Sequence, residues 1–344
     1  MVDAPPSDLR DGCSVDAPPT ALTAAAVHAA RHDIRTWVRH TPLVPSPSLS
    51  ERVGARVWLK LETMQDIGAF KIRGAVNTLL SLSEDERRRG VVTVSTGNHG
   101  RAVATAASRL GVRAVVCMSE LVPEVKRLAV ERTGAEVRIV GRSQDEAEVE
   151  ANRLVAEEHM VPVHPFDDPR VIAGQGTIGL ELLEDLGRVD HLYCGLSGGG
   201  LLGGIGLALK SASSSTRVVG VTMEHGAAMA ESLRAGRPVA VEELPTLADS
   251  LGGGIGLDNR YTFDLVRRVL DQPVLVSEAE IAAAMRFLFR EERLVVEGGG
   301  AACVAPLLRE PAPRLDGNVV CVLSGRNVDP DKFMAVVGEK ARAN

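Results

Sequence analysis

The sequence predicts an α/β fold in which parallel strands alternate with crossover helices. Short apolar runs that suit buried strands alternate along the chain with longer amphipathic runs that suit helices, and this alternation is typical of parallel sheets. The chain has 344 residues, which exceeds the usual size of one domain, so we expect two domains around one cleft. Aromatic residues make up only 3% of the chain, so the cores must be aliphatic.

The expected strands are apolar runs, and the expected helices are the amphipathic runs between them. In chain order, the strands are residues 57–61, 91–95, 113–118, 136–140, 191–194, 218–222 and 319–323. The helices of the first half are residues 83–90, 101–111, 123–134 and 143–159. Gly111 and Gly134 each follow a periodic run and precede a strand, so we expect each of them to end a helix.

The charge balance argues against a nucleic-acid partner. The net charge is -6 and the isoelectric point is about 5.8, so the chain has no basic surface of the kind that binds phosphate backbones. We expect a protein that acts on a small molecule.

Cysteine usage predicts a reducing environment and no metal site. The five cysteines are odd in number and far apart, and three of them lie in apolar runs, so we expect reduced thiols in a cytoplasmic protein. No Cys-x-x-Cys or His-Glu-x-x-His pattern occurs, so we expect no bound zinc.

Two segments could be mistaken for a secretory signal or a membrane-spanning helix. Residues 1–20 are rich in Pro, Ala and Asp and lack a basic start and an apolar stretch, so we expect a disordered tail rather than a secretory signal. Residues 192–209 carry no charge, but seven of these 18 residues are glycine, which suits a turn and tight packing better than a membrane-spanning helix.

A glycine-rich segment, Ser197 to Leu201, directly follows an expected strand and opens a helix. Free backbone N–H groups at such a helix start can hold a phosphate, although a tight structural turn would give the same pattern. The spacing of Gly198, Gly200 and Gly203, with Glu224 about twenty residues on, also fits a dinucleotide-binding fold. A nicotinamide-dependent oxidoreductase is therefore one alternative.

Three further segments favour a different cofactor. Lys71 follows Phe70 in a short apolar turn, where a lysine can be desolvated and act as a nucleophile. Asn98 and Ser324 lie in small-residue segments that each follow an expected strand. A dinucleotide site leaves these three polar residues without a role, whereas a phosphorylated aldehyde cofactor would use all of them.

With these motifs the sequence resembles the fold-type II pyridoxal-phosphate enzymes, in particular the threonine and serine dehydratase and serine racemase group. The resemblance runs from about Thr41 to Asn327 and includes residues 69–75, 95–100 and 173–177. It implies two open, mainly parallel sheets with the cofactor, pyridoxal 5′-phosphate, in the cleft between two domains. It also implies a homodimer or homotetramer. The large domain would comprise residues 21–83 and 164–344, and the small mobile domain residues 84–163.

The resemblance assigns cofactor contacts by position. Lys71 would be the Schiff-base lysine, and Phe70 would pack near the cofactor ring. Asn98 would hydrogen-bond the phenolic oxygen, and Ser324 would face the pyridine nitrogen. The phosphate would lie in the loop formed by Ser197, Gly198, Gly199, Gly200 and Leu201.

The resemblance also assigns substrate contacts. The loop formed by Ser95, Thr96, Gly97, Asn98 and His99 would hold the substrate carboxylate, and Arg153 would assist it. Thr96 also stands where racemases of the group place a hydroxyl that returns a proton to the opposite face, so a serine or amino-acid racemase is a second alternative.

The implied activity is elimination of water from a β-hydroxy amino acid, which yields a 2-oxo acid and ammonia. The freed amine of Lys71 would remove the Cα proton. A neutral hydroxyl at Ser324 does not enforce protonation of the pyridine ring, so loss of the β leaving group becomes the natural outlet. A ligand-binding protein that kept the fold is a third alternative, but it would need neither Lys71 nor Asn98.

Several departures from the group's usual pattern suggest an altered specificity. They are Thr63, Asp66, Ile67, Ala69, Arg101, Ser197 and Arg326. Together with residues 226–229 and 248–256, the pattern is similar to the branch of hydroxyectoine utilisation dehydratases. That branch would need a ring-opened substrate, because a cyclic compound has no free primary amine to react with the cofactor.

Overall fold

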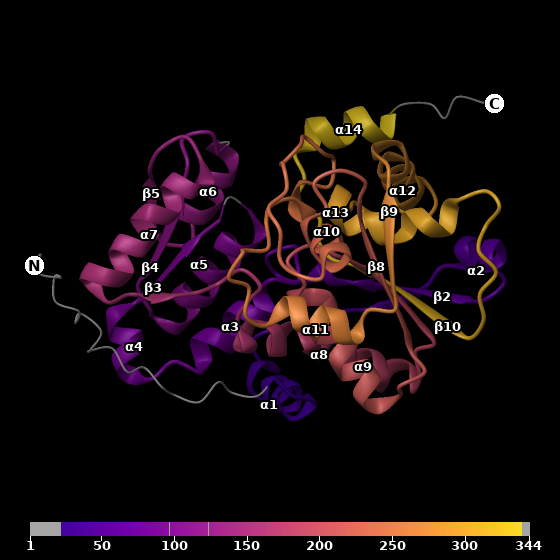
Figure 1. Cartoon of the computed structure of the whole chain (residues 1–344), viewed down its shortest axis with the longest axis horizontal. Coiled ribbons are helices and arrows are strands. Elements are labelled where there is room, and N and C mark those ends of the chain that lie inside the picture. The colour runs from indigo at the N-terminus through magenta and orange to yellow at the C-terminus, as the bar shows by residue number, and fades with distance from the viewer. Residues whose placement is uncertain (1–21, 96, 123, 339–344) are drawn as a thin grey trace, which may run out of the picture.

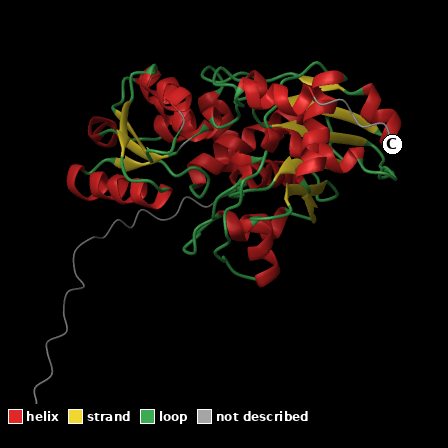
Figure 2. Cartoon of the chain, turned by 90° about the horizontal axis from the view of Figure 1, so that it is seen from above, coloured by secondary structure: helices red, strands yellow, loops and turns green. Residues whose placement is uncertain are grey.

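The computed structural model describes residues 22–95, 97–122 and 124–338 and contains two sheets with helices packed around and between them (Figures 1 and 2). The larger sheet has the strand order β1-β2-β10-β7-β8-β9, and the smaller has the order β5-β4-β3-β6. Within the described residues, neighbouring strands pair in parallel except β1 and β2, which are antiparallel. The α/β class and the two mainly parallel sheets are therefore confirmed.

Each strand expected from the sequence is present, with ends that differ by at most one residue. The strands are β1 (Leu43–Pro45), β2 (Arg56–Leu61), β3 (Val91–Val94), β4 (Ala114–Met118), β5 (Glu136–Ile139), β6 (Val161–Pro162), β7 (His191–Gly195), β8 (Arg217–Met223), β9 (Gln272–Val276) and β10 (Asn318–Leu323). The unexpected strands β1, β6 and β9 each contain a proline and lie at sheet edges. Their apolar pattern is short or interrupted, so it gave little signal.

The four helices expected in the first half are also present. The helices are α1 (Ala24–Ile34), α2 (Pro47–Val53), α3 (Ile72–Leu80), α4 (Glu84–Arg89), α5 (Asn98–Leu110), α6 (Glu124–Glu131), α7 (Gln144–Glu158), α8 (Pro169–Leu186), α9 (Gly200–Ala212), α10 (Ala228–Ala235), α11 (Thr262–Val269), α12 (Glu278–Arg290), α13 (Gly298–Ala301) and α14 (Pro330–Gly338). Short 3₁₀ turns are η1 (Glu62–Met64), η2 (Asp249–Leu251) and η3 (Ala302–Leu308). Helix α5 begins three residues earlier than expected, so Asn98 and His99 lie in its first turn.

Local signals explain where several helices start and stop. Ser83 with Glu86 and Ser143 with Glu146 form capping boxes at the starts of α4 and α7, which satisfy free backbone N–H groups. Gly111 adopts a left-handed conformation with φ of 67° and ends α5, as expected.

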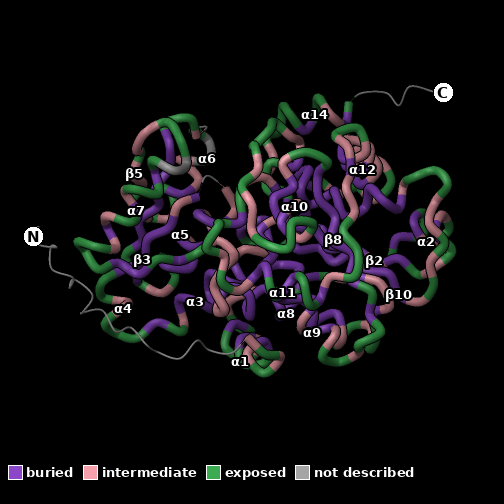
Figure 3. Tube along the Cα trace, viewed as in Figure 1, coloured by how far each residue is buried: buried purple, intermediate pink, exposed green. Residues whose placement is uncertain are grey.

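Apolar clusters cover both faces of each sheet. The central strands of the larger sheet are buried along most of their length (Figure 3). Along β2, Val57 and Leu59 pack into the cluster with α12 and η3, whereas Trp58 packs against the cluster with α8 and α9. On the smaller sheet, residues of α5 and α6 pack on one face and residues of α7 on the other. The clusters consist mainly of Val, Leu, Ile and Ala, as the low aromatic content predicted.

Helix α3 joins the two parts, because it packs against α5 on one side and α8 on the other. The parallel strands of the larger sheet end at one edge, and the segments leading to Lys71, Ser197 and Ser324 leave from that edge. Ligands of open α/β sheets bind at such carboxyl ends. None of the helices described is long and apolar enough to cross a membrane. The expected tail, residues 1–20, lies outside the described residues.

Candidate active site

Lys71 lies at the start of α3 and is tied to the end of β10. The backbone N–H of Phe70 donates to the carbonyl oxygen of Ser324 at 3.0 Å, and Ala69 forms a bridge with Gly325. The Lys71 Nζ donates to the carbonyl oxygen of Pro165 at 2.6 Å and has no carboxylate partner among the described residues. Burial lowers the pKa of Lys71 to about 8, so a useful fraction of its amine is neutral near pH 7.5.

Phe70 packs beside this lysine. The Lys71 Nζ lies 5.3 Å from the centroid of the Phe70 ring, and the ring contacts the apolar cluster of α8 and α9. The ring therefore covers one side of the amine.

The glycine-rich loop leaves β7 and turns into α9. Gly199 is the N-cap residue with φ of 87°, and no side chain caps the helix. The backbone N–H groups of residues 197–199 have no acceptor among the described residues. A Cβ on Gly198 would lie 2.3 Å from the Phe166 ring, so a side chain there would require the loop or Phe166 to shift. Unpaired N–H groups at a helix start are a ready site for an anion.

One short segment places the loop beside the lysine. Pro165 accepts the hydrogen bond from Lys71, and its neighbour Phe166 contacts both Gly198 and Gly200. The carboxylate of Asp167 accepts three backbone hydrogen bonds, at 2.7–2.9 Å, from the start of α11. Sequence reasoning missed residues 164–167, because an extended segment with one proline carries no periodic pattern.

Ser324 follows the last residue of β10 and is only 6% exposed. Its hydroxyl has no hydrogen-bond partner among the described residues. A nearly buried hydroxyl without a partner can donate to or accept from a ligand atom.

Asn98 is held by two residues that sequence reasoning missed. Its Nδ2 donates to the Oε1 of Glu297 at 2.9 Å, and its Oδ1 accepts from the Nδ2 of Asn327 at 2.6 Å. The only available signal was the position of each residue, Glu297 before the glycine run 298–300 and Asn327 after the Ser324 motif.

His99 is a neutral ring in this arrangement. Its Nε2 lies 3.0 Å from the carbonyl oxygen of Val163, so Nε2 carries the proton and Nδ1 is an acceptor. Nδ1 is buried without a partner. Burial and the nearby Lys71 lower the pKa of His99 to about 3. In this tautomer neither nitrogen has a free proton to donate, and the contact of His99 with a substrate carboxylate stays a prediction.

The rest of the expected substrate loop is partly visible. The Ser95 hydroxyl accepts from the N–H of Gly97 at 3.3 Å, which orders the turn before α5. Thr96 lies outside the described residues. The backbone N–H groups of Asn98 and His99, in the first turn of α5, have no acceptor among the described residues.

Arg153 is not brought to this site. It lies on α7, which packs on the face of the smaller sheet opposite α5. Its guanidinium is paired with Glu150 and Glu157 of the same helix. The guanidinium is therefore engaged on the face of the sheet away from α5, and the assistance of Arg153 to the substrate loop stays a prediction.

The residues around Lys71 fit a phosphorylated aldehyde. The set contains an amine without a counter-ion, free N–H groups for a phosphate and a hydroxyl without a partner. In contrast, no group of three or more His, Cys, Asp or Glu side chains is placed to hold a metal ion within the part of the chain that the structure describes.

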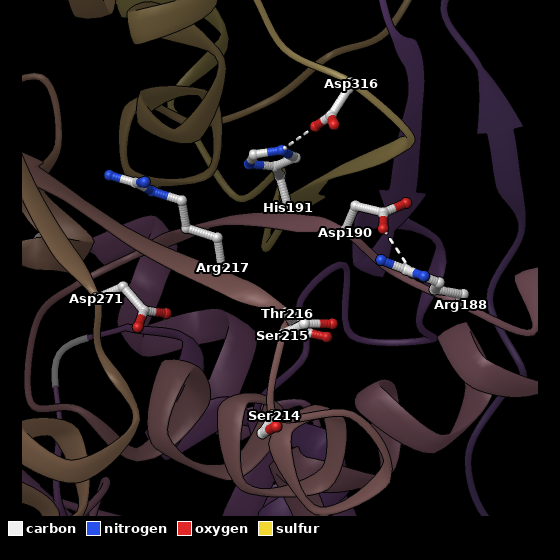
Figure 4. Close-up of a pocket in the computed structure, with 9 residues that line it drawn as sticks. All are labelled: Arg188, Asp190, His191, Ser214, Ser215, Thr216, Arg217, Asp271 and Asp316. Atoms are coloured by element: carbon white, nitrogen blue, oxygen red, sulfur yellow. Dashed lines mark hydrogen bonds and ion pairs between the residues drawn. The ribbon is translucent and has the colours of Figure 1, made fainter.

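A polar pocket of about 410 Å³ lies elsewhere, at the amino ends of β7 and β8 (Figure 4). Its charged groups pair with one another or with neighbours: Arg188 with Asp190, His191 with Asp316, and Asp271 with Lys210. Arg217, also in its lining, donates to the Oε1 of Gln272 at 2.9 Å. The pocket lies on the sheet edge opposite Lys71.

Comparisons with known proteins agree with this arrangement. The chain matches the family model described as pyridoxal-phosphate dependent enzyme over residues 34–325. It is 49% identical over 322 residues to the putative threonine dehydratase of Sinorhizobium fredii, a match that covers 94% of this chain and 97% of that protein. It is 40% identical to the L-threonine ammonia-lyase of Thermotoga maritima, covering 92% and 79%. The structure of maize serine racemase superposes with a TM-score of 0.84 at 31% identity, covering 91% and 96%.

Proposed function

The chain belongs to the pyridoxal-phosphate dependent enzymes, and we propose that it is a dehydratase that converts a β-hydroxy amino acid into a 2-oxo acid and ammonia. The names of the two relatives, a threonine dehydratase and an L-threonine ammonia-lyase, make L-threonine the first substrate to test. Family membership also replaces the nicotinamide-dependent alternative, since the glycine loop then serves a phosphate group rather than a dinucleotide.

One observation carries the proposal. The Lys71 amine has no carboxylate partner and donates only to the carbonyl oxygen of Pro165. Among the described residues, the Ser324 hydroxyl and the backbone N–H groups of residues 197–199 have no hydrogen-bond partner, and all of these groups lie at the same sheet edge. Each group would pair with one part of the cofactor. Lys71 would hold it covalently, residues 197–201 would hold its phosphate, and Ser324 would face its ring nitrogen.

The residues also suggest how a proton moves. Bound pyridoxal phosphate supplies an electron sink for the negative charge left at the substrate Cα. The Lys71 amine has a pKa of about 8, so its neutral form can take the Cα proton near neutral pH. The unprotonated Nδ1 of His99 can accept a hydrogen bond from the substrate hydroxyl or ammonium group.

Three finer statements belong to the same proposal. Residues 84–163, which contain the smaller sheet, would move as a unit to close over the substrate, while residues 21–83 and 164–344 hold the cofactor. The protein would act in the cytoplasm, which agrees with the four buried free thiols of Cys117, Cys194, Cys303 and Cys321. It would assemble as a homodimer or homotetramer, which light scattering tests directly.

The decisive experiment combines an absorbance scan with a substrate panel. We expect a band near roughly 410–420 nm and release of 2-oxo acid and ammonia from L-threonine or L-serine. The panel includes a ring-opened hydroxyectoine derivative, since the hydroxyectoine role also remains a proposal. Lys71→Ala should lose the band and reduce turnover by at least about 10³-fold, whereas the surface variant Lys332→Ala should retain both.

Each alternative has its own outcome. A wild-type protein with the band that only interconverts enantiomers would be a racemase, and the dehydratase proposal would be wrong. A protein without the band that binds amino acids would be a sensor. An active and coloured Lys71→Ala would refute the assignment of the lysine.

A further inference from the structure

Glu297 is a buried carboxyl group that the proposed reaction does not yet use. It is 4% exposed, and no basic side chain pairs with it among the described residues. Its oxygens accept hydrogen bonds from the Nδ2 of Asn98 and the backbone N–H of Asn327, both at 2.9 Å. A buried carboxylate held only by neutral donors is costly to keep, so its role needs an explanation.

The carboxylate touches the two segments that flank the ring of the cofactor in the proposed site. A Cβ on Gly325, the residue after Ser324, would lie 2.7 Å from Oε1 of Glu297. The same oxygen accepts from Asn98, at the start of α5. Glu297 therefore connects the larger sheet to the helix that carries Asn98.

These contacts leave Asn98 a single orientation. Its Nδ2 faces the Glu297 carboxylate, and its Oδ1 faces the Nδ2 of Asn327. If the amide turned over, its oxygen would face a carboxylate and its NH₂ group would face another NH₂ group. In the observed orientation, one N–H of Asn98 has no acceptor among the described residues.

We propose that Glu297 is a positioning residue. It fixes the Asn98 amide so that the free N–H of Asn98 points to the phenolic oxygen of pyridoxal phosphate. This inference rests on the proposed function, because it needs the cofactor beside Asn98. It assigns the carboxylate to control of the cofactor's hydrogen bonding rather than to contact with substrate.

The charges around Glu297 make this contact sensitive to pH. Burial and the nearby Asp249 of η2 raise the pKa of Glu297 to about 7. Two arginines lie near this network. Arg101 of α5 donates to the Oδ1 of Asn327 at 3.2 Å, and Arg326, which follows β10, lies near Arg101. Protonation removes one acceptor position from the Glu297 carboxyl group. The hydrogen bond from Asn98 to Glu297 therefore weakens below about pH 7.

The test is a double-mutant cycle on the cofactor-loaded enzyme, with Glu297→Gln, Asn98→Ala and the double variant. The readouts are the position and pH dependence of the visible band and the dissociation constant for pyridoxal phosphate. We expect each single variant to shift the band and to weaken binding by about 10-fold or more, since each loses a hydrogen bond that involves a charged or cofactor group. Glu297→Gln should also lose the transition near pH 7.

The double variant distinguishes positioning from simple structural support. If Glu297 acts through Asn98, adding Glu297→Gln to Asn98→Ala leaves the band position unchanged and changes the dissociation constant by less than about 2-fold. The reason is that Asn98→Ala already removes the amide that Glu297 positions. Independent effects that multiply would overturn the inference, and so would a Glu297→Gln band identical to wild type at every pH.

Two controls keep the result interpretable. If Glu297→Gln does not fold, Asn327→Asp disturbs the same amide from its other end and should give the same spectral shift; an unchanged spectrum would overturn the inference. Glu280→Gln removes a carboxylate from the cap of α12, remote from this network, and should leave the spectrum unchanged. A wild-type protein that binds no pyridoxal phosphate would instead refute the proposed function.

Discussion

Two groups of buried charges flank α3, and they are organised in opposite ways. On the side of α3 away from Lys71, Arg73 pairs with Glu62 and Glu181 at 2.7 Å, and Lys60 pairs with Glu181 at 2.7 Å. All four side chains are fully buried, and every charge has a partner. On the cofactor side, Lys71, His99 and Glu297 are buried or half-buried, and none of them has an oppositely charged partner among the described residues.

The pKa values reflect this difference. Although burial opposes ionisation, Glu62 and Glu181 raise the pKa of Arg73, and Arg73 and Lys60 lower the pKa of Glu181. On the cofactor side, burial shifts the pKa of Lys71 to about 8, that of His99 to about 3 and that of Glu297 to about 7. Paired charges keep their ionic forms and build the scaffold, whereas unpaired groups titrate and are available to a ligand.

The largest predicted effect is the loss of stability when the paired cluster around Arg73 is broken. Arg73→Met removes the shared partner of two buried carboxylates and should destabilise the protein by about 3–5 kcal/mol, measured by chemical denaturation. Arg88→Met, which removes a surface ion pair with Asp85, should change the midpoint little. A loss from Arg73→Met no larger than that from the control would show that the buried cluster is not a scaffold.

A methyl group in the glycine loop should act on the cofactor side instead. Gly198→Ala places a Cβ 2.3 Å from the Phe166 ring, so the loop must shift, at a cost of about 1–3 kcal/mol. We expect this cost as weaker binding of pyridoxal phosphate, by roughly 10- to 100-fold, in a fluorescence titration. Gly338→Ala, whose Cβ would meet nothing within 4 Å, is the matched control. Equal cofactor affinity in the two variants would contradict the loop's role.

The unpaired histidine should make the fold sensitive to acid. Its pKa falls from 6.5 to about 3 on folding, so its contribution is complete above pH 6.5 and is lost as the pH falls toward 3. Between pH 6.5 and 5 this amounts to about 2 kcal/mol. The raised pKa of Glu297 acts in the opposite direction, so wild type must be compared with His99→Asn, which should lose less stability over that interval. Parallel curves would show that His99 is not the group responsible.

The smallest effect is expected at Arg153. Because its guanidinium pairs with Glu150 and Glu157 on the outer side of the smaller sheet, Arg153→Ala should change the catalytic efficiency on the best substrate by less than about 2-fold. Steady-state kinetics with that substrate decide this. If the Michaelis constant instead increased by about an order of magnitude, Arg153 would be assigned to the substrate site. Helix α7 would then have to move toward the substrate loop during the reaction.

Much of the fold was accessible from the sequence because the signals are local. Runs of valine and leucine specify the central strands, and capping boxes and left-handed glycines mark helix ends. The short edge strands β1, β6 and β9 were missed because pairing with a neighbour, rather than their own pattern, makes them strands. Lys71, the glycine loop and Ser324 could be predicted as site residues because each combines a distinctive residue with a strand end.

The amino-acid sequence by itself determined the α/β class and the order of the central strands along the chain, and it predicted the segments of Lys71, Ser197 to Leu201 and Ser324 as the cofactor site. Only the tertiary structure decided which polar groups meet. It placed Glu297 and Asn327 on Asn98, fixed the proton of His99 at Nε2 and moved Arg153 behind a sheet. The physical reason is that strand and helix preferences depend on neighbours in sequence, whereas burial, hydrogen-bond partners and pKa values depend on residues brought together from distant parts of the chain.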